Sequence, residues 1–433
     1  MKNRLALALA ASMCLNALPA MSEVSISGFG TVGYAQSDQS FAYLRFVEKT
    51  GTFKRDSVFG VQLDAKITPQ IGFTLQTKMA PSMSSDSSWD PTVTWAFASY
   101  RPSNDWLLRL GKLRIPLYLH SENTDVGATF DLARLPAEVY STVPTTDFTG
   151  ASFGKTWNLN DNELSLDGYW GKADSYWRTY KRDNIPEFQS AGSSFGPIKI
   201  DSKGLVLTLR QEENTYRAGL HKADVKSGDG ESFPVTFPYV VLRPGVGYYQ
   251  VSNDLSFPGS PGIQETKSVG VMVYTLGADA GLGNDFRLMG EYVRRAIKES
   301  ELLPDSQAAY LSLRKRIGKW TPYATYARLR TEPKTSNLYQ ALNNNTVPDG
   351  ILDLTTTALI NASQRAGADR IYAYDQSSWS VGSSYSLSPT SKIKAEWMRV
   401  HIGDVSGFVD APPGENIRQK NINVLSLNYN FVF

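Results

Sequence analysis

The chain has 433 residues, of which 41% are hydrophobic and 12% aromatic, with 44 basic and 42 acidic side chains. This near-balance of charge argues against nucleic acid or another polyanion as a partner. The one cysteine, Cys14, lies in an N-terminal leader, so a disulfide scaffold and a metal–thiolate site are excluded for the rest of the chain.

The leader, residues 1–22, is predicted to be an export signal. Lys2 and Arg4 give it a positive start, residues 5–15 form an apolar core, and small residues at Ala20 and Ser22 suit cleavage after Ser22. Cleavage after Ala20 fits the same residues. Beyond the leader no run of about 18 apolar residues occurs, so the sequence predicts no membrane-spanning helix.

From residue 23 onward, short segments alternate between apolar and polar side chains. Because successive side chains of a strand point to opposite faces, each segment predicts a strand with one apolar and one polar face. About sixteen such strands are predicted, and counts of fourteen or eighteen fit the same pattern. They cover residues 24–34, 59–67, 71–78, 93–100, 106–115, 152–157, 164–172, 204–210, 215–221, 267–276, 285–295, 308–316, 320–330, 377–387, 392–402 and 421–433.

The connections between these strands are short and long in turn. The long ones are rich in Ser, Gly, Pro, Asp and Asn, and cover residues 37–54, 80–92, 116–149, 173–203, 222–266, 296–307, 331–376 and 403–420. Short turns at one end and long loops at the other are typical of an all-β, transmembrane antiparallel β-barrel with short periplasmic turns and long extracellular loops. An even number of strands also lets the first and last strands pair, which removes sheet edges that lipid could not satisfy.

The final segment, residues 421–433, has the clearest alternation. Leu425, Leu427, Tyr429, Phe431 and Phe433 share one parity, and the intervening side chains from residue 426 onward are mostly amides and hydroxyls. A sequence that ends on Phe within a strand is difficult to reconcile with water on both faces. The pattern predicts one face against lipid and the other facing a wet lumen.

At this point the chain resembles the outer-membrane porins of Gram-negative bacteria. The strand ending at Phe433 is similar to the C-terminal assembly signal that the barrel-assembly machinery reads in that family. The segment Leu110-Gly-Lys-Leu-Arg-Ile-Pro116 is similar to the strand end that precedes the porin constriction loop.

The resemblance implies that residues 23–433 form one barrel domain in the outer membrane, in contact with its lipid and assembled as a homotrimer. It also implies a water-filled channel for passive diffusion of small hydrophilic solutes and ions. The third long loop, about residues 116–149, would fold into the barrel as the constriction. Such a channel needs no cofactor, metal or nucleic acid.

A diffusion pore needs a narrowing whose charges and width select among solutes. In the third loop, where residues 131–136 are predicted to form a helical turn, the candidates are Glu122, Asp125, Asp131 and Arg134. Strand parity adds the predicted wall residues Lys112, Arg114, Arg287, Glu291, Arg295, Arg314, Lys394 and Glu396. Arg109 has the opposite parity to Lys112 and Arg114, which indicates either a bulge at Gly111 or a different position for one of the three.

Two other functions compete with a pore. A barrel enzyme is not predicted, because His120, His221 and His401 lie in separate segments and no Gly-x-Ser-x-Gly motif occurs. The alternative that stays open is an adhesin or receptor that binds its partner through the long extracellular loops.

Overall fold

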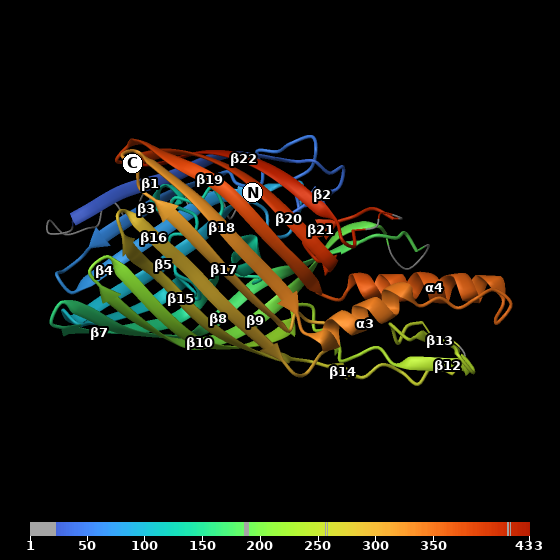
Figure 1. Ribbon diagram of the computed structural model, residues 1–433. Helices are drawn as coiled ribbons and strands as arrows, with labels where there is room; N and C mark the ends of the chain where they lie inside the picture. The colour runs from blue at the N-terminus through green and yellow to red at the C-terminus, as the bar shows by residue number, and fades with distance from the viewer. Residues whose placement is uncertain (1–22, 186–189, 256, 258, 414, 416) are drawn as a thin grey trace.

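Sixteen antiparallel strands close into one barrel (Figure 1), as predicted. The structure is a computed structural model that describes residues 23–433 except 186–189, 256, 258, 414 and 416, so the predicted export signal lies outside the described residues. The barrel strands are β1 (Glu23–Ser37), β3 (Val58–Lys66), β4 (Ile71–Pro81), β5 (Trp89–Ser103), β6 (Trp106–Arg114), β7 (Asp147–Leu159), β8 (Asn162–Lys181), β9 (Gly192–Gln211), β10 (Asn214–Ser227), β15 (Val269–Gly283), β16 (Phe286–Ile297), β17 (Ser306–Lys315), β18 (Trp320–Thr331), β19 (Tyr374–Ser388), β20 (Ser391–Ser406) and β22 (Asn421–Val432).

The barrel closes where β1 pairs with β22. The seam ends in two backbone hydrogen bonds, from Gly28 N to Phe433 O at 2.9 Å and from Phe433 N to Gly28 O at 3.0 Å. A Cβ at Gly28 would lie 2.2 Å from the Phe433 ring, so glycine makes room for the terminal aromatic side chain. Closure leaves no unpaired edge at either end of the sheet.

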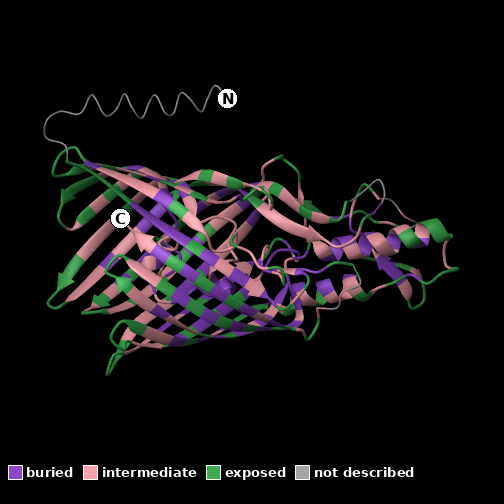
Figure 2. Ribbon diagram, turned by 90° about the horizontal axis from the view of Figure 1, so that it is seen from above, coloured by how far each residue is buried: buried purple, intermediate pink, exposed green. Residues whose placement is uncertain are grey.

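Exposed and buried residues alternate along the wall (Figure 2). In β22, Leu425 is 58% and Leu427 54% exposed, whereas Ile422 and Val424 are buried. Large apolar side chains are therefore on the outside of the barrel, as predicted, which is the reverse of a protein with a dry core and a wet surface.

Two of the predicted long connections are more ordered than the sequence indicated. Residues 173–203 were predicted to be a loop, but β8 and β9 stay paired as far as Lys181 and Gly192, so the connection is only residues 182–191. The connection after β18 contains two helices, α3 (Pro333–Asn344) and α4 (Leu354–Asp369). Pro333 starts the first helix, and the Asp353 side chain caps the second by accepting from Thr356 N at 2.9 Å.

These helices belong to a body that projects from the long-loop end of the barrel (Figure 1). The connection between β10 and β15 supplies the hairpin of β12 (Tyr239–Arg243) and β13 (Val246–Tyr249), and a small pair formed by β11 (Phe233–Pro234) and β14 (Glu265–Thr266). Apolar side chains of both connections form their own small cores, in which Val240 and Tyr248 pack with Ile360. Among the described residues, no helix is long and apolar enough to cross a membrane.

Candidate functional site: the narrowed lumen

The third loop, residues 115–146 between β6 and β7, folds into the barrel. Its apolar residues Leu132 and Val139 are buried in a cluster that also contains Tyr43 from the first loop and Met289 and Val293 from the wall. The lumen is therefore partly filled by a small hydrophobic core. The sequence analysis expected a constriction at about residues 116–149, and the segment that packs inside the barrel is residues 115–146.

The helical turn of this loop is at α2 (Ala137–Tyr140), whereas the sequence predicted it at residues 131–136. Pro136 explains the displacement. A proline disfavours helical backbone angles at the residue before it, here Leu135, and is well suited to precede a helix. A second short turn, η1 (Gly127–Thr129), precedes this region.

Strand β20 holds the loop through a buried cation. Lys394 is fully buried and donates to the backbone oxygens of Gly127 at 2.7 Å and Leu132 at 2.8 Å. In β18, the Tyr323 hydroxyl accepts from Ala133 N at 2.8 Å and donates to Glu396 of β20 at 2.9 Å. Two predicted pore residues, Lys394 and Glu396, thus position the loop.

Strand β16 holds the loop in the same way. Glu291 accepts from Leu119 N at 2.8 Å and also from the Tyr140 hydroxyl. Arg295, which is 3% exposed, donates to the Tyr118 hydroxyl at 3.2 Å and to Val139 O at 3.4 Å. The third loop therefore supplies hydrogen-bond partners for both charged side chains.

Two charged residues of the loop are paired, Asp131 with the wall and Arg134 with the first loop. Asp131 lies 2.9 Å from Lys392 Nζ and 3.7 Å from the Arg314 guanidinium. Arg134 donates from Nε to Asp56 at 2.9 Å. Asp56 comes from the first loop and was not predicted to take part in the site.

Asp125 fixes the base of the loop. It pairs with Lys78 at 2.8 Å and with Arg114, whose Nε also lies 3.1 Å from Asp147. Burial alone would raise the pKa of Asp125, but the two adjacent cations outweigh burial and hold the pKa well below its usual range. This carboxylate is an ionised anchor.

Two of the predicted wall residues lie away from the loop. Lys112 continues the outward parity of Leu108 and Leu110, and it lies opposite exposed Thr149, so the register assigns it to the outer face. Its prediction as a lumen residue was wrong. Arg287 pairs with Asp279 at 3.1 Å and Glu213 at 3.3 Å, close to the short turns.

A polar cavity of about 240 Å³ remains on the side of the lumen formed by β5 to β10. Charged side chains from several elements line it: Arg109, Arg114, Glu122, Asp167, Arg210 and Arg217. Arg109 and Glu122 approach to 3.6 Å, and Arg217 donates to Pro116 O at 2.8 Å. Neither Arg217 nor Asp167 forms an ion pair with another described residue, so both charges are available to a solute.

Of these six, Arg114 and Glu122 were predicted. Arg210 and Arg217 share the parity of buried Thr208 and His221, so strand alternation could have found them. Arg109 was left out because its parity conflicts with that of Lys112 and Arg114. The register runs through Gly111 without a shift, so there is no bulge at Gly111. Lys112 is the residue of the three that faces away from the lumen.

Gly111 is nevertheless special. Its φ is +136°, and a Cβ there would lie 2.2 Å from Ala96 O.

A separate polar cavity of about 260 Å³ lies between the first and third loops, next to Arg55, Asp56 and Asn428. Within the described part of the chain, no group of three or more His, Cys, Asp or Glu side chains is placed to hold a metal ion.

A closed barrel with an apolar exterior and a loop folded into a charged lumen defines the architecture of an outer-membrane β-barrel protein. Among solved structures, OprB of Pseudomonas putida matches with a TM-score of 0.51 at 11% identity, over 95% of this chain and 94% of that one. Outer-membrane-expressed OmpT of Vibrio cholerae matches with a TM-score of 0.50 at 10% identity, over 96% and 99%.

The chain therefore has the sixteen-stranded barrel fold of outer-membrane porins. At these identities the likeness shows the fold alone. No protein-family model matches the sequence, and no curated protein matches it either.

Proposed function

We propose that this protein is an outer-membrane porin of a Gram-negative bacterium, a non-catalytic channel for passive diffusion of small hydrophilic solutes and ions. One observation carries the proposal. The outer face of a closed barrel is apolar, while the lumen is narrowed by a fixed loop to a charged cavity. Lipid can surround such a barrel, and hydrated solutes can enter it.

The route that we propose runs along the β5–β10 side of the lumen. Arg109, Arg217, Glu122 and Asp167 line this part of it, in the cavity of about 240 Å³. Because both signs line this route, we expect a weak preference between cations and anions, together with rejection of apolar solutes.

Assembly is part of the same proposal. The exposed ring of Phe433 stacks on Phe431 and Phe59, with ring centroids 6.4 Å and 6.3 Å apart. We propose that the barrel-assembly machinery reads this terminal strand and that the folded barrels form a homotrimer. Deletion of Phe433 should lower the amount of folded barrel in the membrane while leaving export unchanged. Normal insertion of that variant would contradict the assembly role.

Conductance tests the channel directly. Purified protein in a planar bilayer should give stepwise conductance, and neutral polymers of graded size should block it once they are small enough to enter. Folding is checked in the same sample by resistance to detergent unfolding. A folded sample that gives no steps would exclude the porin proposal.

The projecting body supports a second candidate. The connections that carry α3, α4 and the β12–β13 hairpin have cores of their own, in which Leu342 and Ile360 are fully buried. Such a body suits a receptor or adhesin that binds a partner outside the cell. This function would gain support if the folded barrel did not conduct, and if shortening residues 333–369 abolished attachment of whole cells to a surface.

A further inference from the structure

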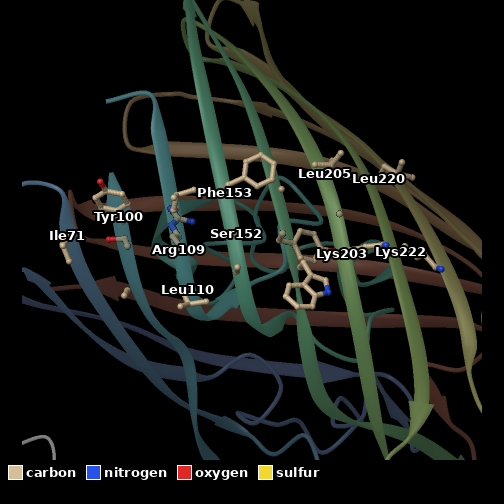
Figure 3. Close-up of a pocket in the computed structure, with 18 of the residues that line it drawn as sticks. Ile71, Tyr100, Arg109, Leu110, Ser152, Phe153, Lys203, Leu205, Leu220 and Lys222 are labelled. Atoms are coloured by element: carbon tan, nitrogen blue, oxygen red, sulfur yellow. The ribbon is translucent and has the colours of Figure 1, made fainter. Parts of the chain in front are cut away.

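A broad apolar groove of about 950 Å³ runs along the outer face of the barrel (Figure 3). Its rims are large side chains, among which Leu110 is 68%, Trp170 65% and Leu205 49% exposed. Its floor includes the small residues Ala151 and Gly168. Large rims beside a small floor leave a channel of the width that hydrocarbon chains fill.

Two lysines line one end of this groove, where Figure 3 shows Lys203 and Lys222 beside each other. They are direct partners in the register of β9 and β10, so their side chains lie next to each other on the outer face. Lys203 also lies opposite Trp170 of β8. The polar end and the apolar part of the groove are therefore continuous.

The charges around this lysine pair leave it incompletely compensated. Beyond it, Asp201 and Asp224 face each other, and Asp201 is already paired with Lys172 at 3.6 Å and Lys226 at 3.0 Å. Lys222 is 3.7 Å from Asp224, whereas Lys203 makes no ion pair with any described residue. Like charges directly opposite on a sheet are unfavourable, so an anion between the two ammonium groups would stabilise the pair.

The height of the pair on the wall fits a membrane boundary. Lys203 lies in β9 well before Gln211, where the strand reaches its short turn. With a rise of about 3.3 Å per residue and a tilt of about 45°, it lies roughly 19 Å above that turn, within an apolar band about 25 Å tall. Long lysine side chains reach upward from such a position to the head groups.

We propose that this site holds a phosphate-bearing lipid of the outer leaflet, with its phosphate between Lys203 and Lys222 and an acyl chain in the groove. The inference rests on the membrane location in the proposed function, but not on conduction. A second copy of the chain is the weaker occupant, because it would have to bury the lysine pair without a counter-charge.

The first test neutralises the pair. The variant Lys203→Gln/Lys222→Gln and the unaltered protein are titrated in a neutral detergent with an acylated, bisphosphorylated glucosamine disaccharide, and binding is read by native mass spectrometry. The dephosphorylated lipid and phosphatidylcholine are titrated in parallel. We expect the double variant to bind the phosphorylated lipid about thirtyfold more weakly, and binding of the other two lipids to be weak and unchanged.

The matched control is Arg399→Gln. Arg399 is an exposed cation on the outer face of β20, opposite Trp379 and Asn423, and it does not line the groove. This variant should bind the phosphorylated lipid as the unaltered protein does. Equal binding by the double variant, or equal weakening by Arg399→Gln, would overturn the proposal.

The second test fills the groove without changing its charge. Ala151 lies between Leu110 and Trp170 in the register, so Ala151→Trp places a large ring in the acyl channel. We expect weaker lipid binding, unchanged conductance steps and an unchanged oligomeric state. Conversion of an oligomer to monomers with lipid binding intact would show that a second copy occupies the groove. Absence of conductance with lipid binding intact would contradict the channel but not this site.

Discussion

The two sides of the lumen use the same kinds of side chain in opposite ways. On the side of β16 to β20, Glu291, Arg295 and Lys394 are each at least 95% buried and each contacts the third loop. On the side of β5 to β10, Arg217 and Asp167 line a cavity without an ion pair to any described residue. Inward-facing charge is thus either an anchor or part of the route, depending on whether the loop covers it.

This difference has an energetic reason. A charge buried against the loop needs fixed hydrogen-bond partners, because an unpaired buried charge costs several kcal/mol. A charge facing a wet cavity keeps its hydration and needs none. The body of the loop therefore rests against β16 to β20, whereas on the side of the proposed route the wall holds only the base of the loop, through Arg114 and Arg217.

Loss of an anchor should have the largest effect. Lys394→Met leaves the oxygens of Gly127 and Leu132 without their donor, at a cost of about 1–3 kcal/mol for each buried acceptor. We expect the loop to loosen and the lumen to widen. Single-channel conductance should rise several-fold and become noisier.

The control for this variant is Thr325→Val. Thr325 is buried on the same side and donates to Ser312, which also belongs to the wall, at 2.8 Å. Its substitution should lower stability without changing conductance. If Thr325→Val widened the channel as much as Lys394→Met, general destabilisation would explain both results and the anchoring role would be lost.

Charge reversal on the open side should change selectivity and leave the width unchanged. Arg217→Glu turns a cation at the cavity into an anion, and a change of about 1.4 kcal/mol in solute energy there corresponds to a tenfold change in permeability ratio. Reversal potentials in asymmetric salt should move toward cation preference. Arg399→Glu, on the outer face, should leave them unchanged.

Two acids of the same loop give a smaller but sharper comparison. Glu122 is 61% exposed at the cavity, whereas Asp131 is 20% exposed and paired with Lys392. Glu122→Gln should shift ion preference toward anions by about twofold to threefold, less than the reversal of a full charge, and leave stability unchanged. Asp131→Asn should lower the unfolding temperature with little effect on selectivity. The opposite pattern would exchange the roles of the two sides.

Strand alternation was enough to predict the closed barrel and its outward leucines, whereas the entry of the third loop was expected only from the resemblance to porins. Alternation predicts whether a side chain points out of the barrel or into the lumen, but not which residues it meets there. Lys394 and Arg217 follow the same rule of parity, and only the path of the third loop separates their roles. That path depends on contacts between residues far apart in the sequence, such as Lys394 with Gly127, which no local pattern encodes.

Alternation is harder to detect in the long connections. Between residues 173 and 203, Ile198 and Ile200 alternate with polar side chains and pack with Trp177, but this apolar pattern is short and lies in a connection rich in Ser and Gly, so the extension of β8 and β9 was missed. The helices α3 and α4 were missed for a different reason. Their buried apolar residues are few and pack in the small cores of the projecting body, so the helical pattern within this polar connection is weak.

The pH dependence of the third loop gives the smallest effect. Burial raises the pKa of Glu138, which is fully buried and accepts from Gln376 at 2.9 Å. An acid with a raised pKa in the folded state favours folding when protonated, and this stability is lost as pH rises above the ordinary value of about 4.3. For Asp125, whose pKa is lowered, the effect on stability has the opposite sign. The stability that it contributes is present above the usual pKa range of an Asp and is lost only in strong acid. Glu138→Gln should therefore raise stability at neutral pH and remove the gain in stability on acidification, measured by detergent unfolding. A variant that kept the full pH dependence would show that another group in the lumen titrates.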